Sequence, residues 1–346
     1  MSNTFSVDLG CASIMIGETE STRLRKEPSV VAIHKRDGVV TAVGADVENE
    51  AILTDVNMAL LRPFREGLTA NYDITYHVLD TILKRSFGRA TRGGELLLSV
   101  PCDIDPVSEA ELIEAALRAG IKACRLVYSP LAALAASNIS PESDALVIDI
   151  GAARTNIMLL CRGELVYMKT AYVGGEAFDR AIADYILKSY GVQISMKVAE
   201  HVKLQIGTVW NPAENGTLSI NVTGKNVKTG ESAEVNMEAS EMLIALEEPV
   251  AQLLEPICVA VSKVPLTFVK SVFERGMMLC GGGACLKGIC QMIEGVSGVK
   301  CRLLPKPETA TIRGLRAISE WMAVGVPDSV RNISRFYIEN YAIVGS

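Results

Sequence analysis

Apolar residues in this chain form short runs that alternate with longer segments in which they recur every three or four positions. Runs such as Leu96–Val100, Ala145–Ile148 and Met277–Cys280 are typical of buried strands. The segment 74–85 instead places Val78, Leu79 and Ile82 on one helical face. Strands that alternate with helices predict an α/β layer fold.

The same patterns predict the individual elements. Strands are expected at 4–8, 12–17, 26–33, 39–43, 96–101, 124–128, 145–149, 155–161, 276–280 and 299–304, with a β-rich stretch at 218–235. Helices are expected at 45–60, 74–85, 108–119, 130–138, 173–190, 199–207, 239–263 and 284–295. Ser108 is the expected N-cap of its helix, with Glu111 at the capping-box position.

The last segment, 327–346, carries apolar residues at helical spacing and predicts an amphipathic helix. They are Val330, Ile333, Phe336, Tyr337 and Tyr341. We expect this helix to pack on its own domain, with docking to a partner or to lipid as the alternative.

One arrangement of strand and turn occurs twice. Ala145–Ile148 leads into Asp149, Gly151 and a small polar turn, and Phe5–Val7 leads into Asp8, Gly10 and a similar turn. A third strand, Met277–Cys280, runs into three glycines. Alone, each Asp-Gly turn is ordinary turn chemistry. Together they suggest a duplicated domain whose two turns bind phosphate groups, with the glycine turn near the sugar and base of a nucleotide.

Length and composition narrow the choice. A chain of 346 residues with 49% hydrophobic residues is expected to form about two domains with sizeable cores. The net charge of −6 argues against a nucleic-acid-binding protein. The nine cysteines are an odd number and lie mostly in apolar runs, which indicates reduced thiols and a cytoplasmic protein. Cys280, Cys285 and Cys290 do not have zinc-ligand spacing, and the three histidines are read as structural.

No charged segment followed by an apolar one opens the sequence, so we expect no signal peptide. No run of about 18 apolar residues is present, so we expect no membrane span.

The motifs, taken in order, resemble those of the actin-like ATPases, and within them the MreB-type bacterial actins. The matching stretches are Asp8–Gly10, Glu27–Ala32, Arg62–Phe64 with Gly67, Val100–Cys102, Val173–Gly175 with Phe178–Asp179, Lys203 with Ile206–Gly207, and Glu274–Gly276 leading into Gly281–Ala284. They occur from residue 4 to about residue 320.

The resemblance implies an actin-like (ribonuclease H-like) fold of two duplicated α/β domains, four subdomains in all, with ATP and Mg²⁺ in a central cleft. The first domain is expected at 1–142, with 34–62 as its smaller subdomain and 313–346 packing back on it. The second is expected at 143–312, with 181–257 as its smaller subdomain. It also implies filaments that grow head to tail.

The resemblance further assigns roles to residues. Asp8 and Asp149 would order the water shell of Mg²⁺. The nucleotide would be bound by Gly10, Cys11, Ala12, Ser13, Gly151, Ala152, Ala153, Arg154, Thr155, Lys203, Gln205, Gly281, Gly282 and Gly283. Glu66 lies on a loop that approaches the cleft in the family, although a solvated loop charge is the simpler interpretation.

Several residues depart from the family pattern. Most important is Ser129, which stands where MreB-type proteins have a Glu that polarises the attacking water. Serine cannot replace a carboxylate in that role, so no catalytic residue is assigned and hydrolysis is expected to be weak or absent. Ala152 and Ala153 replace glycines, Arg154 replaces a Thr and Gln205 a Glu. Arg154 could contact phosphate or extend to the surface.

The expected function is therefore that of a cytoskeletal protein that binds ATP and polymerises into membrane-associated filaments, serving cell shape or intracellular positioning. Its expected partners are itself, a true MreB, membrane proteins and anionic lipid, the last through Arg85, Arg89 and Arg92 around Phe87. The alternatives are a nucleotide-independent pseudo-actin that regulates a true MreB, a sugar or acid kinase of the same superfold, and a chaperone-like ATPase. The expected location is the cytoplasm, peripheral at the inner face of the membrane.

Overall fold

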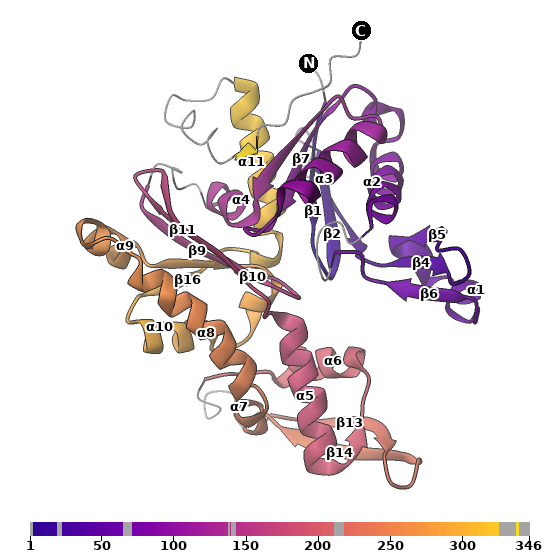
Figure 1. The fold of residues 1–346 in the computed structure, drawn as a ribbon. Coiled ribbons are helices and arrows are strands. Elements are labelled where there is room, and N and C mark those ends of the chain that lie inside the picture. The colour runs from indigo at the N-terminus through magenta and orange to yellow at the C-terminus, as the bar shows by residue number, and fades with distance from the viewer. Residues whose placement is uncertain are drawn as a thin grey trace. The chain divides into compact units, whose positions relative to one another are not determined.

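The structure is a computed structural model that describes residues 3–18, 23–64, 71–137, 139, 143–210, 218–324 and 337–338. The chain divides into two compact units. Unit 1 comprises residues 1–143, 162–164 and 309–346, and unit 2 comprises residues 144–161 and 165–308. Each unit combines a larger and a smaller sheet with helices (Figure 1).

The larger sheet of unit 1 has the strand order β17-β8-β7-β1-β2-β3 within the described residues. β1 is antiparallel to β2 and parallel to β7, which is parallel to β8. The bounds are β1 Thr4–Leu9, β2 Ser13–Glu18, β3 Leu24–Pro28, β7 Glu95–Val100, β8 Ala123–Tyr128 and β17 Tyr337–Ile338. The helices of this unit include α2 Tyr72–Phe87, η2 Gly88–Thr91, α3 Pro106–Arg118, α4 Ser129–Ala135 and α11 Ala310–Val324.

The larger sheet of unit 2 repeats this topology. Its order is β11-β10-β9-β15-β16, with β9 antiparallel to β10 and parallel to β15, which is parallel to β16. The bounds are β9 Ala145–Ile150, β10 Thr155–Cys161, β11 Glu164–Ala171, β15 Met277–Cys280 and β16 Cys301–Leu303. Asp8 and Asp149 occupy corresponding places: Asp8 is level with Ser99 of the parallel neighbour, and Asp149 with Cys280. The duplication predicted from two sequence motifs is thus confirmed in the sheets.

The smaller sheet of unit 1 differs from the sequence prediction. Its strands are β4 Val31–His34, β5 Val40–Val43 and β6 Met58–Leu61, in the order β5-β4-β6. The single strand predicted at 26–33 is split, because the chain leaves the larger sheet after Pro28. The helix predicted at 45–60 is wrong: this stretch forms η1 Gly44–Glu48, α1 Glu50–Leu53 and β6. The Asp55 carboxylate accepts the Asn57 N–H at 2.8 Å, a local turn that competes with the helix.

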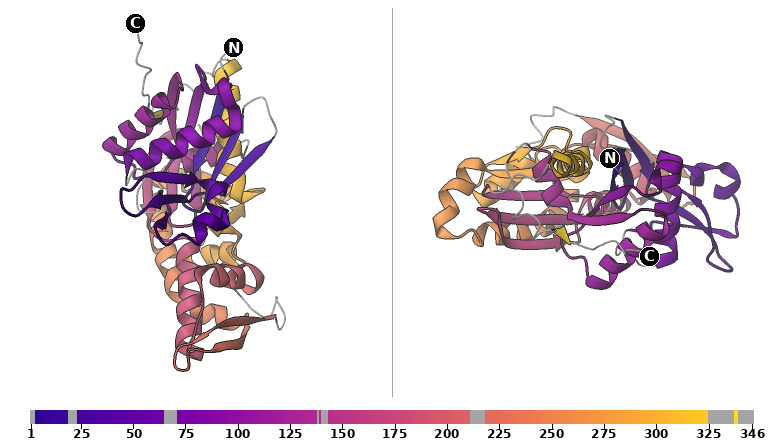
Figure 2. Two further views of the ribbon diagram at one scale, coloured as in Figure 1. Left: turned by 90° about the vertical axis from the view of Figure 1, so that its right-hand side faces the viewer. Right: turned by 90° about the horizontal axis from the view of Figure 1, so that it is seen from above.

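The remaining helices of unit 2 surround its two sheets. Their bounds are α5 Gly175–Tyr190, α6 Met196–Ile206, α7 Glu241–Ala245, α8 Glu247–Ser262, η4 Leu266–Phe268, α9 Val269–Arg275, η5 Gly282–Cys285, α10 Ile289–Ser297 and η6 Pro307–Thr309, the last reaching the border with unit 1. The smaller sheet has the order β12-β13-β14, with bounds β12 Val192–Gln193, β13 Ser219–Asn226 and β14 Ser232–Glu238. Figures 1 and 2 show the β13–β14 hairpin at the far end of α5 from the larger sheet of this unit. An apolar core joins α5, α6, α8 and α10 to β9 and β15.

Two helix ends also differ from the prediction. α3 begins at Pro106 and is capped by Asp105, whose carboxylate accepts the N–H groups of Val107 and Ser108. The Ser108 cap and the Glu111 capping box are therefore wrong. The first described turn after β15 is the 3-10 helix η5, so α10 starts only after Gly288 and not at 284.

The predicted C-terminal helix lies mostly outside the described residues. Its one described part, β17, is a strand that pairs with β8 through Tyr337 and Val127, so Tyr337 is not helical. In the described part of the chain no single helix is long and apolar enough to cross a membrane; only the pair α8 and Leu266–Arg275, bent by 96°, reaches that length and composition together.

Candidate nucleotide site

The turn between β1 and β2 in unit 1 is closed by its own backbone. A Cβ at Gly10 would lie 2.6 Å from the Ser13 carbonyl oxygen, so only glycine fits. The Cys11 thiol is buried and donates a hydrogen bond to the Phe64 carbonyl at 3.0 Å. Asp8, at the end of β1, accepts a hydrogen bond from the Ser99 hydroxyl of β7. The sequence-predicted residues Asp8, Gly10, Cys11 and Ser13 thus lie at one end of the sheet, with Ala12 between them.

The corresponding turn of unit 2 is tied to the start of α5. The Gly151 N–H donates to the Arg154 carbonyl at 2.9 Å and closes the turn. The carbonyls of Gly151 and Ala152 accept the N–H groups of Gly175 and Glu176 at 3.0 and 2.8 Å. N–H groups in the first turn of a helix have no acceptor within the helix, so here the Gly151 turn supplies the acceptors and caps α5.

The close approach of the turn to α5 depends on glycine. A Cβ at Gly174 would lie 2.5 Å from the Gly151 oxygen and 2.7 Å from the Ala152 oxygen. The Thr155 hydroxyl adds a hydrogen bond to the Val173 carbonyl at 2.7 Å. The Val173-Gly174-Gly175 motif is therefore a backbone requirement of this turn.

Arg154 is buried, with 8% of its surface exposed. The alternative in which its side chain extends to the surface is wrong. Ala152 and Ala153 beside it are half-buried, so their methyl groups line the same turn.

The glycine turn, Gly281–Gly283, packs against the end of β9 and the Gly151 turn. A Cβ at Gly281 would lie 2.6 Å from the Asp149 carboxylate, and one at Gly283 would lie 2.5 Å from the Ile150 side chain. Gly281 also has φ +83, which favours glycine. At Gly282 a Cβ would meet nothing within 4 Å. Three motifs far apart in sequence, Asp149, Gly151 and the glycine turn, are thus brought together in unit 2.

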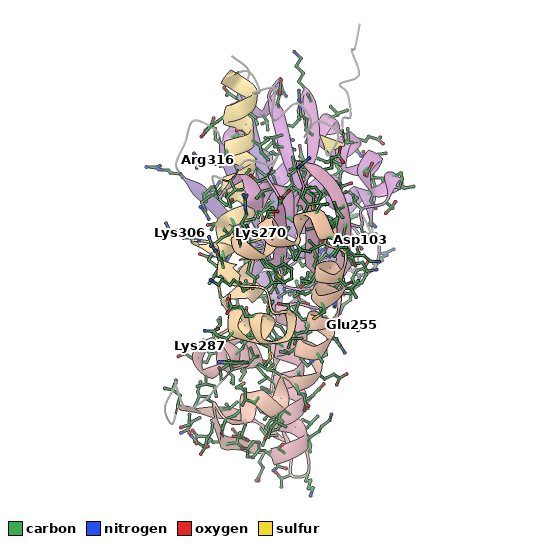
Figure 3. The ribbon with its side chains drawn as sticks, turned by 90° about the vertical axis from the view of Figure 1, so that its left-hand side faces the viewer. Asp103, Glu255, Lys270, Lys287, Lys306 and Arg316 are labelled. Carbon is green, nitrogen blue, oxygen red and sulfur yellow. The ribbon has the colours of Figure 1, made fainter. Side chains whose placement is uncertain are left out.

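A cavity of about 70 Å³ opens beside the glycine turn. Its lining residues are Phe178, Lys203, Leu204, Gly207, Gly282, Gly283, Cys285, Leu286 and Lys287, the last labelled in Figure 3. Lys203 and two of the glycines thus line the same cavity. Gln205, two residues further along α6, is exposed and is not among the lining residues.

The ion-pair partner of Lys203 was not predicted from the sequence. Its ammonium lies 2.7 Å from the Asp179 carboxylate and donates to the Gly175 carbonyl at 3.0 Å. Both side chains are largely buried, and burial raises the pKa of Asp179 although Lys203 opposes the rise. Asp179 stands in a recognised motif, but only the packing of α5 on α6 reveals the pair. Lys203 thereby joins α6 to the residue that the Gly151 turn caps.

The residue that replaces the family's Glu lies in unit 1. Ser129 is the first residue of α4 and is 6% exposed. α4 is packed closely on α11, since any Cβ at Gly314 would run into the Ala132 carbonyl. No carboxylate stands at this position, and Glu66 lies outside the described residues.

The basic segment predicted to attract lipid is partly engaged within unit 1. The Phe87 ring stacks on Phe5 with centroids 4.2 Å apart. Arg85 pairs with the buried Glu27 at 3.1 Å and with Asp46. Arg89 and Arg92 are exposed. Two of the four residues in that prediction are therefore structural.

Relatives of known name match this chain over most of its length. A cell shape-determining protein MreB of Escherichia coli is 31% identical over 323 residues, covering 90% of this chain and 92% of that protein. A cell shape-determining protein Mbl of Bacillus subtilis is 29% identical over 294 residues, covering 83% and 86%.

Solved structures share the fold. MreB5 of Spiroplasma citri bound to ADP has a TM-score of 0.85 at 20% identity and covers 95% of this chain and 99% of that one. A MamK double helical filament has a TM-score of 0.76 at 18% identity, covering 92% and 98%. The predicted actin-like α/β fold is thus confirmed.

The family profile described as MreB/Mbl protein matches residues 2–324. This chain belongs to the MreB/Mbl family of actin-like proteins.

Proposed function

We propose that this chain binds ATP with Mg²⁺ and assembles with copies of itself into head-to-tail filaments that serve cell shape or intracellular positioning. The observation that carries the proposal is the convergence in unit 2 of Asp149, the Gly151 turn and the glycine turn beside a cavity lined by Lys203. The names of its relatives point the same way: MreB5 has been solved with ADP and with AMPPNP, MamK forms a filament, and MreB and Mbl determine cell shape.

The residues at the candidate site fit ATP with Mg²⁺. Short turns with glycine at the end of a strand are a common setting for phosphate binding by backbone N–H groups. Lys287 supplies positive charge at the cavity, whereas the charge of Lys203 is paired with Asp179. Asp149 would hold Mg²⁺ through water, and Asp8 stands at the matching position in the repeated sheet of unit 1. Bound Mg²⁺ would neutralise phosphate charge.

Hydrolysis is proposed to be weak. Ser129 supplies a hydroxyl where a carboxylate is needed to orient and polarise water, and loss of such a group costs about two to four orders of magnitude in rate. Binding does not depend on that carboxylate and would persist. A filament of this protein would then keep its nucleotide for longer than one built from a member with the Glu.

Two observations favour a second candidate function, that of a nucleotide-independent pseudo-actin that co-assembles with a true MreB. The methyl groups of Ala152 and Ala153 line the Gly151 turn where the family pattern has glycine, and the Cys11 thiol is already bonded to the Phe64 carbonyl. The added methyl groups take up space beside the backbone of the turn, and the bonded thiol is no longer available to a phosphate oxygen.

The experiment is a binding and sedimentation assay on the purified chain. Equilibrium binding of ATP is measured with Mg²⁺ for the wild type and for Asp149→Asn, which keeps size but removes the charge. Pelleting is measured with and without nucleotide. Mg²⁺-dependent binding that weakens in Asp149→Asn, with pelleting that needs nucleotide, supports the first proposal. Pelleting without any nucleotide binding supports the pseudo-actin.

The proposed location is the cytoplasmic face of the membrane, with membrane proteins and anionic lipid as further partners. Sedimentation with vesicles of anionic phospholipid, compared with neutral vesicles, tests the lipid contact. Binding to neither kind of vesicle contradicts it.

A further inference from the structure

Two cysteines outside the candidate nucleotide site lie side by side in unit 2. Cys290 is on α10 and Cys301 begins the edge strand β16, and both pack half-buried against the core of the unit. Both are free thiols. The Cys301 thiol donates a hydrogen bond to the sulfur of Cys290.

The backbone holds this pair in place. α10 ends at Gly298 in the left-handed conformation, and the chain turns back directly into β16. The Cys301 N–H donates to the Glu294 carboxylate of α10 at 2.6 Å, and Cys301 is level with Met277 of β15. Cys290 precedes Glu294 by one helical turn, so it lies on the same face of α10 as the carboxylate that binds the Cys301 N–H.

Metal binding does not account for the pair. The described residues contain no group of three or more His, Cys, Asp or Glu that could hold a metal ion. Structural zinc needs four ligands. The chemistry open to two adjacent thiols is oxidation.

We propose that Cys290 and Cys301 form a redox modification site, in which a peroxide oxidant converts the two thiols to an intramolecular disulfide with Cys290 as the attacking sulfur.

The surroundings of Cys290 and Cys301 make one thiol easier to ionise than the other. The hydrogen bond from Cys301 lowers the pKa of the Cys290 thiol, and it outweighs burial and the nearby Glu294 charge, which act in the opposite direction. The same bond raises the pKa of Cys301. Cys290 is therefore the thiolate-forming partner and Cys301 the resolving thiol.

The reaction balances with hydrogen peroxide. The Cys290 thiolate attacks one peroxide oxygen, the O–O bond breaks, and hydroxide leaves with the proton released from Cys290 as water, which gives the sulfenic acid. Cys301 sulfur then attacks the Cys290 sulfur, the S–O bond breaks, and the hydroxide leaving group takes the Cys301 proton as a second water. Two thiols are oxidised and one peroxide is reduced.

Other cysteines of the chain are less suited to this reaction. Burial raises the pKa of Cys124 to about 12 and that of Cys161 to about 11. Cys285 is exposed, but burial of its sulfur and the Glu308 charge raise its pKa. Cys290 is thus expected to react first.

Trypsin provides a specific readout on the full-length protein. Cleavage after Lys287, Lys300 and Arg302 releases peptide 288–300 and dipeptide 301–302. After treatment with hydrogen peroxide at low molar excess, mass spectrometry should find these two peptides linked, at their summed mass less two hydrogens. Dithiothreitol should separate them.

Variants assign the roles. Cys301→Ser should abolish the linked peptide and leave Cys290 as a sulfenic acid that dimedone traps. Cys290→Ser should leave Cys301 unlabelled. Cys285→Ser is the matched control and should form the link at the wild-type rate. Absence of the linked peptide in the folded wild type, or faster oxidation of Cys285 than of Cys290, would overturn the proposal.

Discussion

A pair of neighbouring glycines gives the sharpest test of the candidate site. Gly281→Ala places a methyl group 2.6 Å from the Asp149 carboxylate and into the Ile150 carbonyl, at a residue with φ +83. With ψ 161, this backbone conformation is one that almost only glycine adopts, and it costs alanine about 1–3 kcal/mol. Relief of the close contacts costs about 1–3 kcal/mol more, because a buried strand must shift. We therefore expect a loss of about 3 kcal/mol in the free energy of unfolding.

The measurement is equilibrium unfolding in urea in a Trp321→Phe background, followed by the fluorescence of Trp210, which lies in the same unit as Gly281. A loss of about 3 kcal/mol raises the unfolding equilibrium constant roughly a hundredfold. The control is Gly282→Ala, where a Cβ meets nothing within 4 Å. Its stability should stay within about 0.5 kcal/mol of the wild type.

The control also reports on binding. Gly282 lines the cavity beside Lys203, so its new methyl group occupies space that a nucleotide would use. ATP affinity should fall about tenfold in Gly282→Ala while the fold persists. A Gly281→Ala protein as stable as the wild type would refute the packing argument. Unchanged ATP affinity in Gly282→Ala would refute the assignment of the cavity.

Two further substitutions test charge and packing. Lys203→Met leaves the Asp179 carboxylate buried without its cation and should lower the free energy of unfolding by about 2–3 kcal/mol in urea titrations. The pKa of Asp179 is raised in the folded state. The wild type should therefore lose stability relative to Asp179→Asn as the pH rises from 3.8 through the raised pKa. A stability difference between the two proteins that does not change with pH would contradict this. Phe87→Ala removes the stack on Phe5 and should lower the thermal midpoint, while Arg89→Ala, at an exposed residue, should not; equal midpoints would contradict the structural role.

Features that depend on short motifs could be read from the sequence. Asp8 and Asp149 each follow an apolar strand and precede a glycine, and that local order is enough to find both halves of the duplicated sheet. The glycines at 281–283 were likewise visible, and close backbone approach accounts for Gly281 and Gly283. Their packing against Asp149 required the parallel pairing of β15 with β9.

Features that depend on contact between distant elements could not be predicted from the sequence. Asp179 and Lys203 lie on two helices, and no periodicity indicates that they pair. The stretch 45–60 has helical spacing, but the Asp55 turn and pairing of β6 with β4 override it. Asp105 outcompeted Ser108 as a cap because Pro106 prefers the first helical position.

Our central proposal is that this MreB/Mbl family member binds ATP but lacks the carboxylate that drives hydrolysis. Its most direct test is phosphate release at saturating Mg·ATP from the wild type, Ser129→Glu and the uncharged control Ser129→Gln, each first shown to be folded and to bind ATP. The account predicts slow release by the wild type and by Ser129→Gln, and release about a hundredfold faster by Ser129→Glu. Release by the wild type as fast as by Ser129→Glu would contradict it.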